Sequence, residues 1–224
     1  MCGRFALTMP TEAMEDLFEA SAVETLPAAE ERYNICPTQT IPVVVAHDGA
    51  RHIAPMRWGF LPKWYKTPNG GPLLINARSE TIREKPAFRA AFPRRRCLIP
   101  ASGFYEWTHR LGRGQAPWYI TMAGNAPMAM AAIWQGWTPP EGGERAITCA
   151  IVTCDAGEDI AEVHHRQPVF VAPDAVETWL EGDAGAAGEL MVPSPAGVLR
   201  RHRVSTEVNS MKNQGPGLIA PIAE

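Results

Sequence analysis

Short apolar runs alternate with turn-forming residues along the whole chain. The runs are only three to eight residues long and are rich in Val, Ile and aromatic side chains, and Gly or Pro recurs between them. This rhythm is typical of strands joined by tight turns. The predicted strands are Ile41–Ala46, Ala54–Phe60, Cys97–Ile99, Trp118–Met122, Met128–Trp134, Ile147–Cys154, Val169–Ala172 and Leu199–Val204.

Helical spacing of apolar residues is rarer. One helix is predicted near the start of the chain, where Thr11 can cap it and apolar residues recur on one face. Two more are predicted over Asp174–Glu181 and over Ser79–Phe92, although Pro86 should interrupt the latter. Few helices among many short strands predict an α+β fold, with a bent sheet or barrel as its β-rich core and the helices at its periphery.

The chain is predicted to form one domain over residues 1–224. Its composition, 46% hydrophobic and 20% charged, is that of a folded globular protein, and no linker, internal repeat or low-complexity block divides it. No run approaches the roughly 18–20 apolar residues that span a bilayer, and no secretory signal precedes the first predicted strand. We expect a cytoplasmic protein without membrane association, and we expect a monomer.

Five cysteines are spread along the chain: Cys2, Cys36, Cys97, Cys149 and Cys154. Their odd number and the expected cytoplasmic location argue against a disulfide framework. No Cys-x-x-Cys pair occurs, which argues against structural zinc. We expect free thiols and neither a metal nor any other cofactor.

Positive charge is concentrated in the middle of the chain. Residues 51–113, called the basic segment below, hold thirteen Lys and Arg against three Glu, a net charge of +10, whereas residues 1–50 carry −6 and residues 114–224 carry −7. Aromatic residues are interleaved with these charges, namely Trp58, Trp64, Tyr65, Phe104, Tyr105 and Trp107. Phosphate attraction combined with base stacking requires such a surface. A solvated face without a ligand is the alternative.

Cys2 directly follows the initiator methionine. Because Met is commonly removed before a small second residue, Cys2 is expected to carry both an α-amine and a thiol on adjacent carbons. The amine, with a reference pKa of about 8, and the thiol, with one of about 8.5, can condense together with an aldehyde. The amine forms a Schiff base and the thiol then closes a thiazolidine ring. The alternative is that Cys2 is a small buried residue without a reaction to perform.

Polar residues interrupt two further apolar runs. Glu106 lies between aromatic residues, where apolar walls would raise its pKa toward neutrality and prepare it to transfer protons. A surface position or an ion pair with an arginine is the alternative. Asn76 and Arg78 would share one face of an extended chain, where an amide can orient a sugar and a guanidinium can bind a phosphate. A turn-forming role for Asn76 is the alternative.

His164 and His165 precede a predicted strand. Histidine titrates near neutral pH, but adjacent side chains on an extended segment point to opposite sides, so at most one is expected to face a given site. A structural or solvated role for the pair is the alternative. No acidic or Cys partner stands at ligand spacing, so no metal is expected here.

The order of these motifs along the chain is more specific than any one of them. The sequence begins Met-Cys-Gly-Arg-Phe and continues with Tyr33–Gln39 (YNICPTQ), Arg57–Phe60 (RWGF), Ile75–Arg78 (INAR), Gly103–Trp107 (GFYEW), His164–Pro168 (HHRQP), Val208–Asn209 and Lys212–Gly215 (KNQG). This order closely resembles that of the SRAP family, the SOS response-associated peptidase-like proteins that protect abasic sites in single-stranded DNA. The resemblance covers nearly the whole chain.

The resemblance implies a covalent reaction at an abasic site. Cys2, as the mature N-terminus, would attack the ring-opened aldehyde of the deoxyribose and form a thiazolidine cross-link. Glu106 would transfer protons and Asn76 would position the sugar. His164 would assist ring opening, reversal of the cross-link and a lyase-type strand scission. The implied partner is single-stranded DNA with abasic sites, the implied location is beside the nucleoid, and no cofactor is implied.

The resemblance also implies a DNA-binding surface. Its arginines would contact phosphates, whereas its aromatic residues would line a cleft and stack on splayed bases. The matching positions are Arg4, Arg78 and Arg166 among the arginines, and Trp107, Trp64 and Tyr65 among the aromatic residues.

Two positions depart from the family pattern. Gln167 stands where many members carry Met, and Thr153–Gly157 (TCDAG) only partly matches the commoner Thr-Thr-x-Ala-Asn. Thr153 is retained, so we expect it to be a polar group near the cross-link. Residues 64–72 also resemble a longer loop than is usual in the family.

Two other functions remain open. One is an N-terminal-nucleophile cysteine peptidase or amidohydrolase, in which the α-amine acts as base for its own thiol, with self-removal of Met1 as one such cleavage. The other is a non-catalytic single-strand binding module in which Cys2 is merely packed. That module would give no reason for Glu106, because a carboxylate repels phosphate.

Overall fold

A small β-barrel lies at the centre of the computed structural model, which describes residues 2–27, 30–110 and 114–222. The strands that form the barrel are β4 (Thr40–His47), β5 (Ala50–Trp58), β7 (Arg96–Ala101), β10 (Met128–Trp137) and β11 (Ala146–Asp155). They pair in the order β11-β10-β7-β4-β5, and a parallel pairing of β5 with β11 closes the ring. Three short strands extend its wall: β2 (Ala20–Ala22), β6 (Asn76–Arg78) and β12 (Arg166–Pro168).

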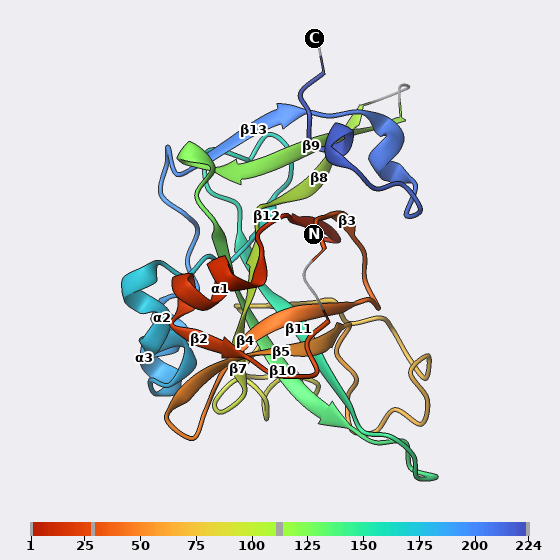
Figure 1. Ribbon diagram of the computed structural model, residues 1–224, viewed down its shortest axis with the longest axis vertical. Coiled ribbons are helices and arrows are strands. Elements are labelled where there is room, and N and C mark those ends of the chain that lie inside the picture. The colour runs from red at the N-terminus through yellow and green to blue at the C-terminus, as the bar shows by residue number, and fades with distance from the viewer. Residues whose placement is uncertain (1, 28–29, 111–113, 223–224) are drawn as a thin grey trace.

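A second, five-stranded sheet lies above the barrel in Figure 1, with the order β13-β9-β8-β1-β3. Its strands are β1 (Arg4–Leu7), β3 (Arg32–Ile35), β8 (Gly103–Arg110), β9 (Gly114–Met122) and β13 (Leu199–Arg203). Only Ser102 separates β7 of the barrel from β8 of this sheet, so one nearly continuous run of chain connects them. The predicted α+β fold with a β-rich, bent or barrel-like core is confirmed.

The barrel strands are the ones that the apolar runs predict best. All six residues of β7 are buried, and so are seven consecutive residues of β11. Such uninterrupted burial requires cover on both faces of a strand. The barrel interior covers one face, while short helices and loops cover the other. On the outside of β7, for example, the Trp179 indole Nε1–H donates to the Cys97 carbonyl at 2.8 Å.

The helices are short and peripheral. They are α1 (Thr11–Phe18), α2 (Val176–Leu180) and α3 (Ala184–Glu189), with single 3-10 turns at Ala123–Asn125, Pro173–Ala175, Thr206–Asn209 and Pro216–Leu218. The first two confirm predicted helices, but the predicted cap of the first is wrong: Pro10 is the N-cap residue, and no side chain caps the helix. The helix predicted over Ser79–Phe92 is also wrong. That segment forms a succession of turns, because Pro86 lacks the N–H that would continue the hydrogen bonds of a helix.

Two differences concern strands. The predicted strand Val169–Ala172 is wrong in its boundaries: the ladder to β11 is made by Arg166–Pro168, and the chain then crosses to β10 through the single bridge of Phe170 with Met130. The strands β1, β2, β3, β6 and β8 were not predicted. They are three or four residues long or carry several polar side chains, so no apolar run marks them.

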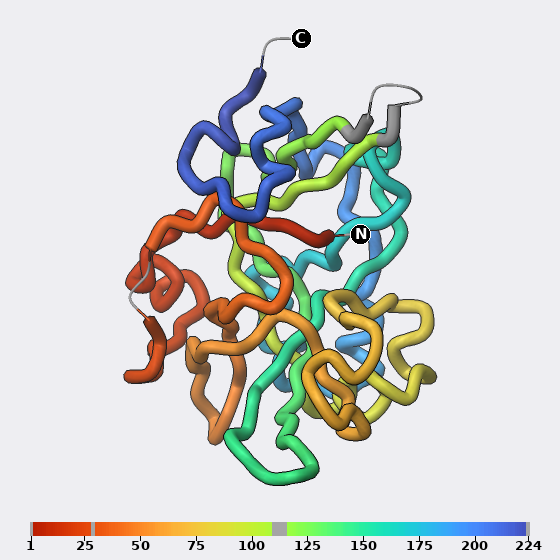
Figure 2. Tube along the Cα trace, turned by 90° about the vertical axis from the view of Figure 1, so that its right-hand side faces the viewer, coloured from red at the N-terminus to blue at the C-terminus, as the bar shows by residue number. Residues whose placement is uncertain are grey.

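The C-terminal segment (residues 205–215) packs beside the beginning of the chain. Figure 2 shows it lying directly over the N-terminal strand, and Arg4 donates from Nη1 to the Val208 carbonyl at 2.7 Å. The first strand and residues 205–215 thereby share one region of the molecule. Among the described residues, no helix is both long and apolar enough to traverse a lipid bilayer.

Candidate functional site

Cys2 lies just before β1 and is fully buried. Its carbonyl oxygen accepts a hydrogen bond from Nδ2 of Asn76 at 3.0 Å. Burial and the nearby Glu106 carboxylate raise the pKa of the Cys2 thiol far above its ordinary range. The thiol is therefore protonated at neutral pH, and its proton must leave during any reaction that forms a bond to sulfur.

Glu106 lies on β8, the strand that pairs with β1. It is one of the few buried charged residues of the described chain, and burial raises the pKa of its carboxyl group. The predicted burial between apolar walls and the predicted upward pKa shift are both confirmed. A carboxyl group with a raised pKa can give and take protons closer to neutrality than an exposed one.

Asn76 and Arg78 lie on β6, whose two-residue spacing places them on the same side of the strand as predicted. β6 runs parallel to β11, with Asn76 opposite Ile151 and Arg78 opposite Thr153. Oδ1 of Asn76 is buried and has no hydrogen-bond partner among the described residues. Arg78 is exposed, whereas Thr153 is fully buried. The amide thus offers an acceptor inside the site, and the guanidinium lies at its solvent side.

His164 ends a turn that leads into β12. Its Nδ1 lies 3.0 Å from the Arg166 backbone nitrogen and 3.2 Å from the Arg166 carbonyl oxygen, so the backbone of Arg166 holds the ring in place. Burial lowers the pKa of His164 to about 4. The prediction that the adjacent histidines point to opposite sides is wrong: the rings stack with centroids 4.5 Å apart, because the segment turns instead of running extended.

The low pKa of His164 can be tested directly. In the folded protein the His164 imidazole is expected to stay neutral from pH 8 to pH 5 and to titrate near its lowered value of about 4. In urea it is expected to return to the ordinary value of about 6.5. Side-chain NMR of the imidazole, assigned with His164→Gln, measures both transitions. A folded-state midpoint at 6 or above would show that the ring is solvated.

The linked effect on stability has a definite sign. Because the folded state binds the His164 proton less tightly than the unfolded state, the free energy of unfolding falls as the pH drops from about 6.5 toward 4. His164→Gln is expected to lose this part of the pH dependence.

Arg166 is buried on β12, and its guanidinium is held within the protein. It forms ion pairs with Glu80 and with Asp155, the latter at 2.8 Å, and donates from Nη2 to the Thr153 carbonyl at 2.7 Å. Two carboxylates thus neutralise it already. This arrangement does not favour the predicted phosphate contact, and it assigns Arg166 to holding the turn of His164 against β11.

Arg4 and Trp107 line a shallow pocket of about 370 Å³, together with Gly3 and Asn209. The Arg4 guanidinium lies 6.0 Å from the centre of the Trp107 ring, and the indole Nε1–H donates to Oδ1 of Asn209 at 2.7 Å. The C-terminal segment thereby orients both residues. The structure brings these two predicted DNA-binding residues together at one surface.

Asn34 on β3 holds Arg4 and the C-terminal segment together beside this pocket. The sequence does not predict this role. Its side chain is fully buried; Oδ1 accepts from Arg4 Nη1 at 2.9 Å, and Nδ2 donates to the carbonyls of Ser210 and Asn213 at 2.9 and 3.1 Å. Gln214 adds a bond from Nε2 to the Asn34 carbonyl at 3.1 Å. Both residues lie within motifs of the family pattern, but that pattern alone gives no role to a buried amide.

Replacing Asn34 with Ala is expected to destabilise the protein by about 2–4 kcal/mol, because it leaves several buried polar groups without partners. Urea denaturation measures the loss, and hydrogen exchange is expected to rise in residues 205–215. The control is Asn69→Ala at an exposed loop position, expected to cost less than about 0.5 kcal/mol. Equal losses in the two variants, or unchanged exchange in the C-terminal segment, would contradict this account.

Trp64 and Tyr65 lie in the loop that joins β5 to β6, and they have different environments. The Trp64 side chain is 58% exposed. Tyr65 is only 7% exposed, packs with Leu61 and Trp137, and donates from its hydroxyl to the Pro72 carbonyl at 3.0 Å. The prediction that Tyr65 stacks on a base is not supported, because its ring is already enclosed. Trp64 remains a candidate stacking residue.

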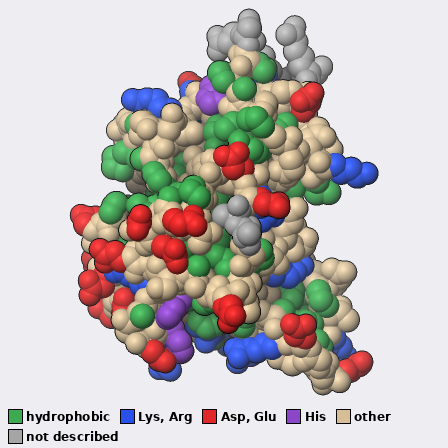
Figure 3. All heavy atoms as spheres, in the orientation of Figure 1, with side chains coloured by type: hydrophobic (Ala, Val, Ile, Leu, Met, Phe, Trp, Pro, Cys, Tyr) green, Lys and Arg blue, Asp and Glu red, His purple; other side chains and the backbone are tan. Residues whose placement is uncertain are grey.

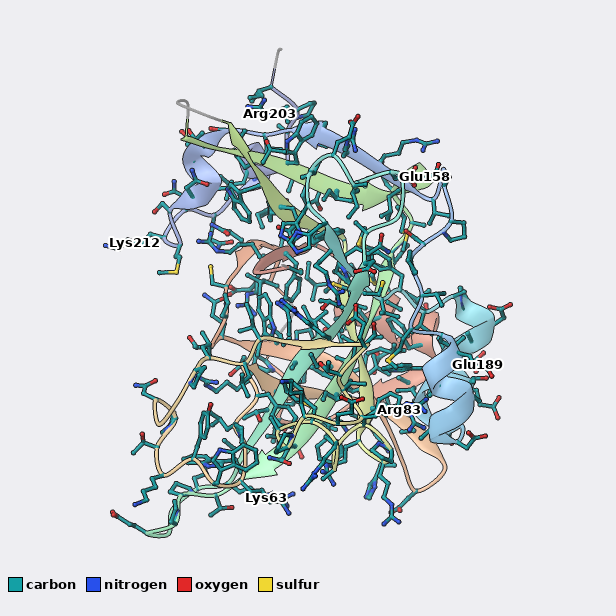
Figure 4. The ribbon with its side chains drawn as sticks, turned by 180° about the vertical axis from the view of Figure 1, so that it is seen from behind. Lys63, Arg83, Glu158, Glu189, Arg203 and Lys212 are labelled. Atoms are coloured by element: carbon teal, nitrogen blue, oxygen red, sulfur yellow. The ribbon has the colours of Figure 1, made fainter. Side chains whose placement is uncertain are left out.

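The basic segment is less available to a polyanion than its net charge predicts. Several of its arginines donate hydrogen bonds to backbone carbonyls of the protein itself. They are Arg51, Arg57, Arg83, Arg95 and Arg96. Arg83, for instance, lies beside α3 and donates to the Ala184 carbonyl at 2.8 Å (Figure 4). The exposed cations of the segment include Lys63, Lys66, Arg78, Lys85, Arg89 and Arg94.

All five cysteines are buried free thiols. In the described part of the chain, no group of three or more His, Cys, Asp or Glu side chains is arranged to hold a metal ion.

Fold and site together define a β-rich protein that packs the cysteine next to its N-terminus against a buried carboxyl group and an amide. A sequence model of the family described as SOS response associated peptidase (SRAP) matches residues 1–211. The chain is 33% identical over 222 residues to the abasic site processing protein YoaM of Bacillus subtilis, covering 98% of this chain and 97% of YoaM. It is also 33% identical over 229 residues to the abasic site processing protein YedK of Escherichia coli, covering 99% and 100%. The chain belongs to the SRAP family.

Solved structures support the same fold. A crystal structure of a protein from Bacteroides thetaiotaomicron superposes with a TM-score of 0.87 at 21% identity, covering 99% of this chain and 100% of that chain. Another, from Bordetella bronchiseptica, gives a TM-score of 0.77 at 26% identity, covering 92% and 100%. The arrangement of barrel and second sheet is therefore shared with experimentally determined proteins.

Proposed function

We propose that this protein processes abasic sites in single-stranded DNA by joining Cys2 covalently to the open-chain deoxyribose. One observation carries the proposal: Asn76 donates to the Cys2 carbonyl at 3.0 Å while Glu106 lies near enough to raise the pKa of the Cys2 thiol. An abasic sugar supplies an aldehyde, and an aminothiol is the side-chain arrangement that captures one. Relatives that match nearly the whole chain are named abasic site processing proteins.

The reaction begins once Met1 has been removed and Cys2 carries a free α-amine. The amine attacks the aldehyde carbon, and water leaves to form an imine. The Cys2 sulfur then adds to the imine carbon, and the thiol proton is transferred to the nitrogen. The product is a thiazolidine, and one water is released for each cross-link. Glu106 serves both steps, because a carboxyl group with a raised pKa can protonate the leaving hydroxyl and accept the thiol proton.

His164 and Asn76 act on the sugar. The closed hemiacetal must open before the aldehyde exists, and the neutral His164 ring can accept the proton of the anomeric hydroxyl as the C–O bond breaks, while the ring oxygen takes a proton from an acid such as Glu106 or water. The Oδ1 acceptor of Asn76 can receive a hydrogen bond from a sugar hydroxyl. Proton abstraction from the imine would instead lead to strand scission, and hydrolysis of the ring would reverse the cross-link.

DNA is bound by charge and stacking. Arg78, which is exposed, would contact a phosphate, and so would Arg4, although its guanidinium also bonds to Asn34 and Val208. Trp107 lines the pocket beside Arg4. The exposed indole of Trp64 can stack on a splayed base. Because exposed cations supply this affinity, binding to intact single strands should weaken as salt is raised.

Intact mass spectrometry tests the proposal. The mature protein is mixed with a single-stranded oligonucleotide that carries one abasic site, and with the same oligonucleotide carrying an ordinary base. The expected product is stable to denaturation and has the mass of protein plus DNA minus one water, with the abasic substrate only. Absence of this adduct in a protein shown to lack Met1 would overturn the proposal.

The family description favours peptidase activity as a second candidate, with removal of Met1 as its reaction. The buried thiol, whose pKa is raised, is a poor source of thiolate for attack on an amide. The test is to make the protein with Met1 in place, in an extract without methionine aminopeptidase. Release of Met1 by the purified protein, abolished in Glu106→Gln, would support it; a stable Met1 would exclude it.

A further inference from the structure

An apolar groove lies between α1, the start of β10 and the 3-10 turn that precedes α2. Its volume is about 660 Å³, within the range of roughly 300–1,000 Å³ that is typical of ligand-binding pockets. None of the residues that line it belongs to the candidate site around Cys2. The site described above therefore leaves this groove without a function.

The lining of the groove carries no charge. It consists of apolar side chains, with Ser194 and Gly197 as the exceptions. The lining residues Leu17 and Val192 are 39% and 57% exposed. Large apolar side chains left in water within one groove favour an interaction surface over ordinary solvent exposure.

No Lys, Arg or His is among the residues that line the groove, which come from residues 5–31, 114–144 and 167–199. Two cations border it, Arg51 and Arg200, which donate to the carbonyls of the lining residues Phe18 and Gly197 at 3.1 and 3.2 Å. The first and third of these parts contain seven and five Asp or Glu. Figure 3 shows acidic side chains gathered on the side of the molecule where α1, α2 and α3 lie.

Three exposed carboxylates are next in sequence to lining residues. Asp16 precedes Leu17, Asp174 follows Pro173, and Glu177 follows Val176. None of the three forms an ion pair within the described chain. Glu19 lies near Arg51 at 3.8 Å and is therefore already partly neutralised.

We propose that this groove binds a segment of a partner protein in which apolar side chains alternate with lysines or arginines. The apolar side chains would fill the groove and displace water from Leu17 and Val192, while the cations would reach Asp16, Asp174 and Glu177. The complementary charge favours this partner and excludes a polyanion. DNA bound at the Cys2 site would be repelled from this face, so both partners can bind at once.

The chemistry of the groove also limits how the segment binds. Four prolines line it, Pro127, Pro173, Pro193 and Pro195, and proline has no N–H to donate to an added strand. Recognition must therefore rest on side chains and not on β-augmentation. A small uncharged ligand could fill the same volume, but it would leave the flanking carboxylates unused.

Three pools of short fluorescein-labelled peptides test the proposal by fluorescence anisotropy. In the first pool Leu, Val or Phe alternates with Lys or Arg; the second replaces the cations with Asp or Glu; the third replaces the apolar residues with Ser. Only the first pool is expected to bind to the wild-type protein. When a peptide of the first pool binds, methyl NMR is expected to show chemical-shift changes at Leu17, Val176 and Val192.

Variants at exposed positions make the test specific. The double variant Leu17→Ser/Val192→Ser and the charge-reversal variant Asp16→Lys/Glu177→Lys are each expected to weaken binding of the first pool at least tenfold. The matched control is Leu73→Ser, which alters a leucine that is 50% exposed outside the groove. It is expected to leave binding unchanged. Cross-linking to abasic DNA serves as the check that every variant is folded.

Three results would overturn the proposal. The first is equal binding of the acidic pool, and the second is binding that neither double variant weakens. The third is a concentration-dependent dimer, measured by light scattering, that Leu17→Ser/Val192→Ser dissociates, because the occupant would then be a second copy of this chain. Binding of an uncharged apolar dye without binding of the first pool would likewise count against a protein partner.

Discussion

Replacing Cys2 with Ala is expected to abolish the covalent adduct with abasic DNA, to below one part in a hundred of the wild-type yield. The physical reason is that the variant retains the α-amine but loses the sulfur that closes the ring, so only a hydrolysable imine can form. Binding to the same oligonucleotide without the lesion is expected to stay within twofold. Denaturing gel electrophoresis measures the adduct, and fluorescence anisotropy measures the binding.

Two companion variants separate the roles of the amine and the thiol. Cys2→Ser retains the amine and is expected to form an adduct only when borohydride is added to reduce the imine. Insertion of one residue before Cys2, with the thiol intact, is expected to remove the stable thiazolidine adduct and to leave at most an imine that borohydride can trap, because the amine and the thiol then no longer lie on adjacent carbons. A normal adduct in the inserted variant would show that the thiol acts without the α-amine, and the thiazolidine mechanism would then be wrong.

The second large effect is expected at Glu106. Glu106→Gln preserves shape but cannot transfer protons, so the rate of cross-linking is expected to fall about 10²–10³-fold, as is typical when a general acid–base residue is removed. Single-turnover kinetics with excess protein measure the rate. The matched control is Glu162→Gln, whose carboxylate is exposed and pairs with Arg201. A control loss as large as that of Glu106→Gln would show that the rate responds to overall charge.

Glu106→Gln is expected to lower the rate of cross-linking without lowering the stability of the folded protein. Because burial raises the pKa of Glu106 above its ordinary value of 4.5, the folded state binds this proton more tightly than the unfolded state. The stabilising contribution is present at low pH and is lost as the pH rises through the raised pKa. Glu106→Gln carries no charge at any pH, so it is expected to be at least as stable as the wild type at pH 8. A marked loss of stability there would mean that the charged carboxylate is needed for folding.

The sequence predicts the barrel better than the sheet above it. β7, β10 and β11 are buried on both faces, so their residues form apolar runs that stand out from their surroundings. β8 instead begins with apolar and aromatic residues around Glu106 and ends in three polar residues, so the apolar segment that carries Glu106 does not reveal the bounds of the strand. β6 has only three residues and is held by its parallel pairing with β11, a long-range contact that no local pattern contains.

The sequence likewise predicts some residues of the candidate site and misses others. Cys2, Glu106 and Asn76 were found because their chemistry is unusual for their positions, and the structure brings them together. Asn34 was missed because a buried amide that bonds carbonyls more than 170 residues away leaves no local trace. Tyr65 was misjudged for the converse reason: its residue type suits base stacking, but burial against Trp137 decides its role.

The contact between the two ends of the chain has a consequence for biosynthesis. β1 pairs with β3 and β8, and Arg4 reaches across 204 positions to the Val208 carbonyl. The wall beside Cys2 can therefore form only after nearly the whole chain has left the ribosome. If Met1 is removed during synthesis, as the proposed function requires, the removal would act on the nascent chain before Cys2 is enclosed, because part of the wall that encloses it is made last.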